Sequence, residues 1–241
     1  YYWTYAQHPD LSYFDHPPLV AWLIWLGTHV LGDGVAGVRL GTWVCGLGCT
    51  AAGAQLLRAF GVDAGGRCLW MLLSLASPVL ALVHFLATPD PPLVCCWTLT
   101  MLALWHARDG GWRWWLLAGL TAGLALVAKY SGAFLAVGGL VLLLFDARMR
   151  AQLRRPAPYV AVLVAAAVFS PVVIWNANRG FESFRFQTEG RWERSRLGVR
   201  WIGAFLVSQF GLLHPVIALA MPMASWWSVR RMRAGDRGVL W

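Results

Sequence analysis

Two short segments of this sequence place an acidic residue immediately before a pair of prolines and an apolar stretch. Asp15 and His16 stand before the first pair, and Asp90 stands before the second. An acidic side chain in this position caps the free backbone amides of a helix start, and proline favours the first helical position. We therefore predict that Asp15 and Asp90 are helix N-caps. For either residue alone, a purely capping role favoured by the helix dipole is the simpler interpretation.

Lys129 is the only lysine among the 241 residues, and it follows a long apolar run. A cation there can simply extend toward lipid headgroups. Alternatively, Lys129, His16 and arginines from a later segment form a cationic cradle for a lipid phosphate. Ionised donors bind phosphate oxygens through short, strong hydrogen bonds, which favours this chemistry.

That later segment, residues 176–199, is rich in arginine with glutamates interleaved. Pairing of arginine with glutamate on a solvated loop is the simpler interpretation, because exposed pairs form freely and contribute little. A loop that binds an anion is the alternative. The charged residues in or beside this segment are Arg179, Glu182, Arg185, Glu189, Arg191, Glu193, Arg194, Arg196 and Arg200.

The composition is that of a membrane protein, with 59% hydrophobic residues, 13% charged residues and a mean hydropathy of +0.56. Such a chain is too apolar for a water-soluble domain of this length. The net charge of +9 could suggest nucleic acid, but the arginines lie between apolar blocks and not along one soluble surface. We therefore exclude nucleic acid as a partner.

The apolar blocks have the length that a helix needs to cross a bilayer, about 20 residues. We predict an all-α polytopic bundle of seven spans. The spans are expected at 36–57, 68–87, 91–107, 113–129, 131–146, 157–175 and 200–221. Residues 18–31 form a shorter block that opens on proline, which is typical of an interfacial helix.

Arginines in the loops predict the orientation of these spans, because cytoplasmic loops carry an excess of positive charge. Four arginine-bearing loops fall on one side, which leaves residues 1–35 and 176–199 as extracytoplasmic loops. Asp15, His16, Asp90 and Lys129 then share one membrane boundary, and this common level favours a functional site over separate roles. An extracytoplasmic start also leads us to expect further sequence before residue 1.

Several short motifs follow one another along the chain in a set order. They are Tyr1-Tyr2-Trp3, residues 13–23, Val38-Arg39-Leu40, residues 88–93, Ala128-Lys129-Tyr130, residues 170–176 and residues 183–187. This ordered set resembles bacterial glycosyltransferases similar to dolichyl-phosphate-mannose protein mannosyltransferases, the family 39-like enzymes. The aminoarabinose transferase of lipid A is a more distant likeness. The resemblance covers nearly the whole chain.

The resemblance implies a GT-C fold in which residues 1–241 form one transmembrane domain, with further sequence expected at both ends. Such proteins reside in the bacterial inner membrane. They transfer a sugar, usually with inversion, from a polyprenyl-phosphate donor to an acceptor protein, lipid or glycan at the outer face. The family's general base normally precedes the position of Tyr1.

The same resemblance implies roles for individual residues. Asp15 and Asp90 are implied as catalytic acids facing the outer cavity. The implied donor-phosphate ligands are His16, Lys129, Arg185 and Arg191. A divalent metal ion is a further implied cofactor, with Asp15 and Glu189 as its ligands.

A transporter or flippase for an anionic lipid or solute is the alternative function. Its sites would lie near the middle of the membrane, between inverted repeats with broken helices. In this sequence the ionisable residues avoid the centres of the predicted spans, and no repeat is visible. The pattern therefore favours a transferase.

Overall fold

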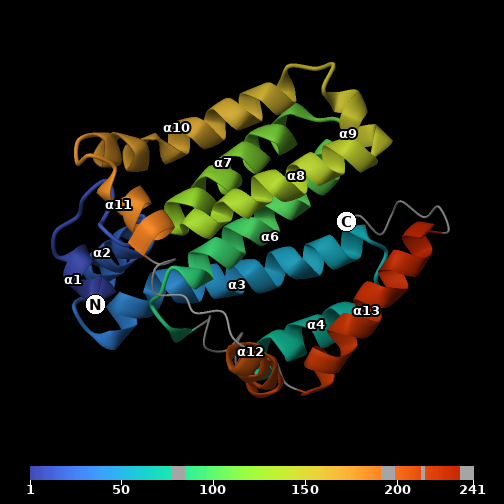
Figure 1. The fold of residues 1–241 in the computed structure, drawn as a ribbon, viewed down its shortest axis with the longest axis horizontal. Helices are drawn as coiled ribbons and strands as arrows, with labels where there is room; N and C mark the ends of the chain where they lie inside the picture. Colours follow the sequence, from blue (N-terminus) through green and yellow to red (C-terminus); the bar gives the residue numbers. More distant parts are fainter. Residues whose placement is uncertain (78–84, 191–198, 213–214, 234–241) are drawn as a thin grey trace.

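The computed structural model describes residues 1–77, 85–190, 199–212 and 215–233, and helices are the only regular elements in these ranges. Five helices form the main body (Figure 1). They are α2 (Leu19–Leu31), α3 (Val35–Ala59), α6 (Asp90–Ala107), α7 (Trp112–Ala128) and α10 (Ala157–Ala177). Each packs against the next in this order. The expected all-α bundle is confirmed.

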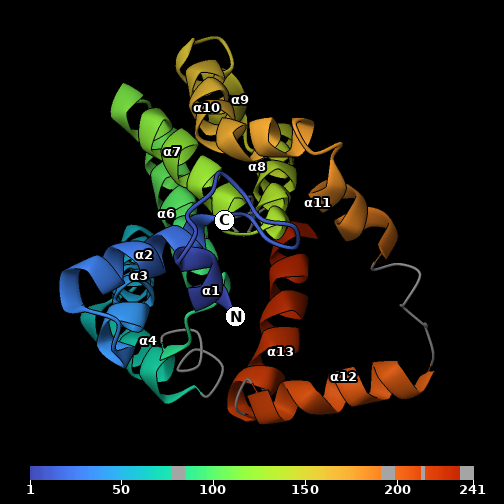
Figure 2. The ribbon, with the colours of Figure 1, turned by 90° about the vertical axis from the view of Figure 1, so that its left-hand side faces the viewer.

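Further helical elements flank this body or connect its helices. They are α1 (Tyr2–Ala6), α4 (Ala64–Ala76), η1 (Tyr130–Ala133), α8 (Phe134–Phe145), α9 (Ala147–Gln152), α11 (Glu182–Arg185), η2 (Phe186–Gly190), α12 (Val199–Leu212) and α13 (Pro215–Arg233). In Figure 2, α12 lies across the direction of α13, apart from the main body.

Most of the predicted spans coincide with single helices within a few residues. The predictions at 36–57, 91–107, 113–129 and 157–175 correspond to α3, α6, α7 and α10, and the interfacial segment 18–31 corresponds to α2. By length and hydropathy, α3 and α10 are the described helices able to cross a bilayer unaided. The total of seven spans stays a prediction.

The predicted span at 200–221 is wrong, because two helices occupy it. α12 ends at Leu212, and α13 begins at Pro215. Proline has no backbone N–H to continue a preceding helix, and its ring restricts the residue before it to extended conformations. The second half of the predicted span 68–87 falls largely on residues 78–84, which lie outside the described ranges.

The capping prediction for the two acidic residues is also wrong. The N-cap of α2 is Pro18 and that of α6 is Pro89, and at neither helix start does a side chain accept a capping hydrogen bond from the backbone N–H groups. Asp90 is instead the first helical residue, where the helix dipole still favours a negative charge. In both cases the carboxylate binds a partner from elsewhere in the chain, which competes with capping.

Small residues let the long helices approach closely, as is common where lipid removes the hydrophobic drive for association. At Gly119 of α7, a Cβ atom would lie 2.3 Å from the carbonyl oxygen of Ala161 in α10. Thr100 and Thr121 share a buried hydroxyl hydrogen bond of 2.8 Å between α6 and α7. These contacts fix the spacing of the helices whose ends carry the charged residues.

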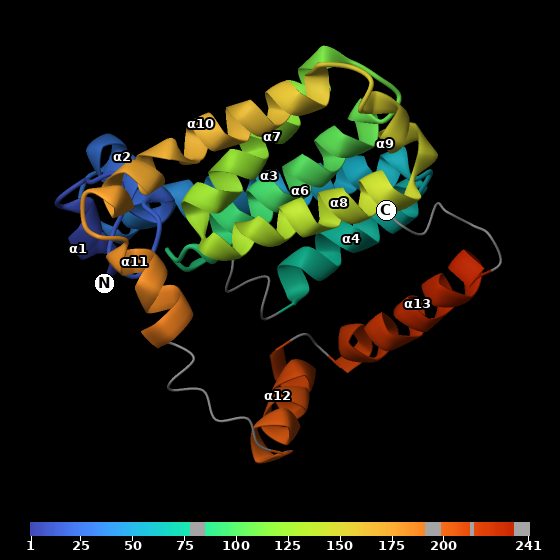
Figure 3. The same cartoon turned by 45° about the horizontal axis from the view of Figure 1, so that its top comes forward.

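Charged side chains gather at the two ends of the body. At one end, Arg148 pairs with Asp109 at 3.0 Å and Gln152 donates to the carbonyl of Arg108 at 3.0 Å. The opposite end holds α1, the start of α2, the start of α6, the end of α7 and the end of α10 (Figures 1 and 3). The acidic residues and the lysine singled out from the sequence are all at this second end.

The glycine packing can be tested with two matched substitutions in a detergent-solubilised sample. Replacing glycine by alanine favours the helical state by about 1 kcal/mol at either position. Gly119→Ala, however, forces its methyl group into the α10 backbone. A Cβ at Gly138 meets no described atom within 4 Å. We expect Gly119→Ala to lower the thermal unfolding temperature, since overpacking costs about 1–3 kcal/mol, and Gly138→Ala to leave it unchanged or raised. Equal effects of the two changes would contradict the close α7–α10 contact.

Candidate active site

Asp15 lies in the loop between α1 and α2, and two tyrosines of the chain start hold it. The hydroxyl of Tyr5 donates to Oδ1 of Asp15 at 2.6 Å, and the hydroxyl of Tyr1 donates to Oδ2. The imidazole of His16 lies 4.0 Å from the same carboxylate. His16 also contacts the ring of Tyr2 edge to face, with centroids 5.6 Å apart. Asp15 is thus a mostly buried carboxylate with a shell of aromatic side chains.

The tyrosine hydroxyls keep Asp15 ionised. Burial alone would raise the pKa of Asp15, but the hydrogen bonds from Tyr1 and Tyr5, the nearby His16 and a backbone hydrogen bond together hold the pKa below its ordinary value. Burial, together with the adjacent carboxylate, raises the pKa of Tyr5 far above its ordinary value. The phenols therefore remain protonated donors while the carboxylate remains an anion.

Asp90 and Lys129 form an ion pair between neighbouring helices. Nζ of Lys129 lies 2.7 Å from Oδ1 of Asp90, and both side chains are partly exposed. Asp90 opens α6, and Lys129 follows the last residue of α7 in an extended conformation. Because α6 and α7 run in opposite directions, the start of one meets the end of the other. The structure thus brings together two residues that are 39 positions apart in the sequence.

The two acidic residues lie at the same end of the body. Leu19, in the first turn of α2, packs against a buried cluster from the start of α6 and the end of α7. That cluster consists of Leu93, Cys96, Ala125 and Ala128. The structure thus places Asp15, His16, Asp90 and Lys129 at one end of the helical body. Their common membrane boundary stays a prediction.

The segment after α10 links both acidic sites. Tyr130, next to Lys129, shares a 2.6 Å hydroxyl hydrogen bond with Ser183 of α11. Gln187, four residues after Ser183, donates to the backbone carbonyl of Asp15 at 2.6 Å. Phe186 contacts Phe14 with ring centroids 4.9 Å apart. One turn of helix therefore touches the lysine region and the Asp15 loop together.

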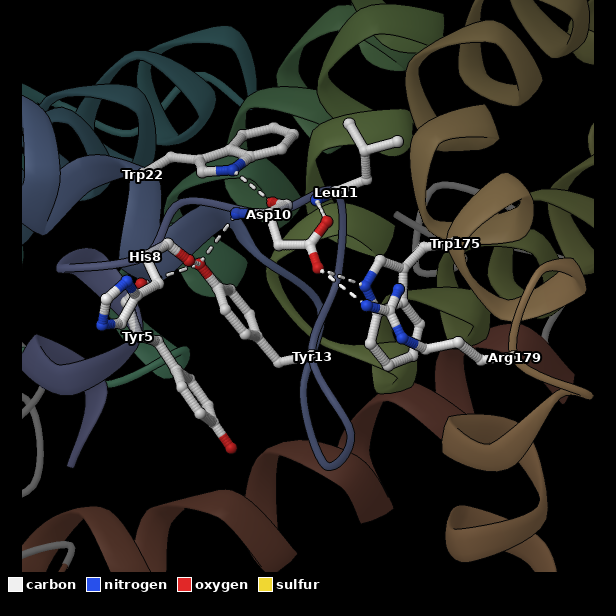
Figure 4. A network of polar contacts seen from close by, with 8 residues as sticks. All are labelled: Tyr5, His8, Asp10, Leu11, Tyr13, Trp22, Trp175 and Arg179. Atoms are coloured by element: carbon white, nitrogen blue, oxygen red, sulfur yellow. Dashed lines mark hydrogen bonds and ion pairs between the residues drawn. The ribbon is translucent and has the colours of Figure 1, made fainter.

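A second polar network connects the Asp15 loop, residues 7–18, to the end of α10 (Figure 4). Oδ2 of Asp10 accepts from the indole N–H of Trp175 at 2.7 Å and from Arg179 at 3.4 Å. The Arg179 guanidinium stacks over the Trp175 ring at 4.3 Å. The indole N–H of Trp22 donates to the Asp10 carbonyl at 2.9 Å. Asp10 was not singled out as a site residue from the sequence, where a lone aspartate in a loop gives no signal of its partners.

The remaining predicted ligands are less well placed. Arg185 is exposed, and within the described ranges its guanidinium has no hydrogen-bond or ion-pair partner. Arg191 and the side chain of Glu189 lie outside the described part of the structure. Among described residues, no three His, Cys, Asp or Glu side chains gather as a metal site. Both oxygens of Asp15 are already bound by phenols, so the described geometry does not favour the metal predicted at Asp15 and Glu189.

Chemically, the Asp15 and Asp90 carboxylates and the Lys129 ammonium group lie at this end of the helical bundle. Among them, Lys129 can neutralise an anion, and Asp15 can accept a hydrogen bond from a bound hydroxyl group. Tyr1 belongs to the Tyr1-Tyr2-Trp3 motif and Tyr5 follows it closely, but the sequence did not predict that either would contact Asp15. The clustering of aromatic residues before an acidic residue was the available signal.

Comparison with solved structures defines the class of protein. Two structures of ArnT from Cupriavidus metallidurans match this fold at 22% sequence identity. The apo structure gives a TM-score of 0.70 and covers 99% of this chain and 46% of ArnT. The structure bound to undecaprenyl phosphate gives 0.71 and covers 95% and 45%. The architecture is the GT-C membrane fold.

The sequence narrows this class to a family. The family described as dolichyl-phosphate-mannose-protein mannosyltransferase matches residues 15–175. The chain belongs to this family, as the ordered motifs indicated.

Curated relatives agree with this assignment. Lipid A galacturonosyltransferase RgtD of Rhizobium johnstonii is 30% identical over 250 residues, which is 98% of this chain and 50% of the relative. The undecaprenyl phosphate-alpha-4-amino-4-deoxy-L-arabinose arabinosyl transferase of Pseudomonas aeruginosa is 29% identical over 191 residues, or 76% of this chain and 34% of the relative. The chain thus spans half the length of the first relative and a third of the second.

The ionised state of Asp15 predicts a pH-dependent contribution to stability. A carboxyl group whose folded pKa is depressed stabilises the protein above its unfolded pKa of about 3.9, and this contribution is lost as pH falls through the folded pKa. Tyr5→Phe removes one of the responsible hydrogen bonds. We expect it to destabilise the protein at neutral pH by about 1–3 kcal/mol, with a smaller difference from wild type below about pH 4. Thermal unfolding in detergent across this pH range measures both values.

Tyr159→Phe is the matched control, because the Tyr159 hydroxyl donates to a backbone carbonyl at 3.0 Å and touches no carboxylate. Its effect should be small and independent of pH. A pH-independent loss in Tyr5→Phe as well would show that the hydrogen bond to Asp15 does not hold the carboxylate ionised.

Proposed function

We propose that this chain carries the donor-phosphate site of a multi-pass transferase of the bacterial inner membrane. In this proposal it moves a sugar from a polyprenyl-phosphate donor to a lipid acceptor at the extracytoplasmic face. The observation that carries the proposal is the Lys129–Asp90 ion pair at the end of the bundle that also holds Asp15. A cation fixed at this level is placed for the phosphate of a carrier whose chain lies in the bilayer.

Lys129 would act on the charge that develops during transfer. When the bond between sugar and phosphate breaks, the leaving phosphate gains negative charge, and a preorganised cation stabilises that charge most where water is excluded. Asp90 holds the Lys129 ammonium at 2.7 Å, so the cation needs little rearrangement to meet the phosphate. Asp90 is therefore proposed to position Lys129, and Lys129 to bind the donor phosphate together with His16.

Asp15 is proposed to orient the acceptor and not to remove its proton. A carboxylate whose pKa lies below the ordinary value is a weak general base near neutral pH. An ionised carboxylate held by Tyr1 and Tyr5 still accepts a hydrogen bond from an incoming hydroxyl group. This role needs a fixed orientation, which the two phenols and the Gln187 contact supply.

The names of the relatives support both the reaction and the acceptor. One relative is named a lipid A galacturonosyltransferase and another an undecaprenyl phosphate-linked arabinosyl transferase. A neighbour in fold has been solved with undecaprenyl phosphate bound. These names favour a transferase over the transporter considered from the sequence, and a lipid acceptor over a protein.

Substitutions in the ion pair provide the main test in the full-length protein. We expect Lys129→Ala to lower kcat by about 10²–10³-fold, the usual loss when one preorganised donor is removed, and Asp90→Asn to lower it strongly as well. Lys129→Arg should retain part of the activity. The assay follows transfer of label from polyprenyl-phosphate sugars to lipid A in reconstituted membranes.

Asp109→Asn is the matched control, because Asp109 forms a 3.0 Å ion pair with Arg148 at the opposite end of the body. It should leave transfer unchanged. Wild-type rates in both Lys129→Ala and Asp90→Asn would refute the site, and label appearing on protein but not on lipid A would refute the lipid acceptor.

A further inference from the structure

Asp10 lies in residues 7–18, the loop between α1 and α2, and contacts both α2 and α10 (Figure 4). We propose that Asp10 is a positioning residue, which fixes the loop so that Tyr5 keeps Asp15 in its functional orientation. The effect on activity rests on the function proposed above, whereas the mechanical coupling of Asp10 to the loop does not. Asp10 itself touches neither Asp15 nor the Lys129 pair, so it would act only through its neighbours.

The contacts of Asp10 come from three parts of the fold. Its carboxylate accepts from the buried Trp175 indole at 2.7 Å, from Arg179 at 3.4 Å and from the backbone N–H of Leu11 at 2.7 Å. Its carbonyl accepts from Trp22 of α2 at 2.9 Å. Residues 7–18 contain no regular helix, so backbone hydrogen bonding alone leaves this loop poorly defined. Side-chain contacts to two long helices must therefore set its conformation.

A short chain of contacts joins Asp10 to Asp15. The backbone N–H of Asp10 donates to the hydroxyl of Tyr13 at 3.2 Å, and that hydroxyl donates to the carbonyls of Tyr5 at 2.9 Å and His8 at 3.1 Å. The rings of Tyr13 and Tyr5 stack with centroids 4.1 Å apart and planes within 5°. The Tyr5 hydroxyl then donates to Asp15. A shift of Asp10 is passed to Tyr13, then to the Tyr5 ring and its hydroxyl.

The Trp175 contact is the part of this anchor that matters most. The Asp10–Arg179 pair is solvent-exposed on both sides, and exposed pairs contribute little. The Trp175 hydrogen bond is short, goes to an ionised acceptor, and comes from a ring that is only 6% exposed. A phenylalanine at position 175 keeps an aromatic ring but removes the N–H donor together with part of the buried indole, whereas Asp10→Ala removes the acceptor and leaves the indole in place. An effect that both variants share is therefore assigned to this bond.

The first experiment measures the loop without any assay of transfer. Hydrogen–deuterium exchange of the full-length protein in detergent reports the amides of Leu11 and Tyr13, which bond to Asp10 Oδ1 and to the His16 carbonyl. We expect Asp10→Ala and Trp175→Phe to speed exchange in peptides covering residues 8–16 by roughly tenfold to a hundredfold, the loss of a hydrogen bond to a charged group. Unchanged exchange in both variants would overturn the anchor.

Asp63→Asn is the matched control for exchange. Asp63 caps α4 by accepting from the Gly66 N–H at 2.8 Å, at the other end of the body. It should alter exchange near the start of α4 and leave residues 8–16 unchanged. Faster exchange of the loop in Asp63→Asn would show that the effect of Asp10 is a general loosening of the protein, which also contradicts the proposal.

The second experiment separates positioning from plain stability with a double-mutant cycle on kcat. If Asp10 acts through Tyr5, the double variant Trp175→Phe/Tyr5→Phe should lose no more kcat than the more damaging single variant. The reason is that both changes then impair the same interaction, the orientation of Asp15 by Tyr5. Losses that multiply would show that Asp10 and Trp175 only hold the fold, and would overturn the positioning role. An inactive wild type would instead refute the proposed function, while the exchange measurement still decides whether Asp10 anchors the loop.

Discussion

The cost of placing an ionisable side chain in hydrocarbon governs this structure. A charge at the centre of a bilayer costs at least about 2.5–3.5 kcal/mol on insertion scales, so charged residues stand where helices end. Every charged group of the candidate site obeys this rule: Asp90 opens α6, Lys129 follows α7, Arg179 follows α10, and Asp15 precedes α2. The helices in turn pack closely through glycine, alanine and threonine, which keeps their ends in register.

This arrangement lets distant segments build one polar surface. The loop before α2 supplies Asp15, and the α6–α7 pair supplies Asp90 and Lys129. The turn after α10 bonds to Tyr130, the neighbour of Lys129, through Ser183 and to the Asp15 carbonyl through Gln187. Phe181 has a left-handed conformation (φ 61°) just before α11, and its N–H donates to the carbonyl of Asn176 near the end of α10 at 2.8 Å. This residue starts the turn that carries Ser183 and Gln187. Strained backbone of this kind is commonly kept where a functional surface requires it.

The two carboxylates of the site differ in their partners, and this difference divides their proposed roles. Asp90 faces a cation, so its proposed role is to position Lys129. Asp15 faces neutral phenols, which keep it charged and oriented without neutralising it. Both arrangements lie in a chain that belongs to the mannosyltransferase family and has the GT-C fold.

The sequence by itself determined the fold class and the positions of the five helices of the main body, because apolar block length and charge exclusion depend on local composition. It did not determine what each charge binds. Both aspartates were expected to cap helices, yet Asp90 binds a lysine 39 positions away and Asp15 binds Tyr1 and Tyr5. The anchor between Asp10 and Trp175 joins residues 165 positions apart. Such partners depend on how antiparallel helices bring their ends together, and only the tertiary structure decides that.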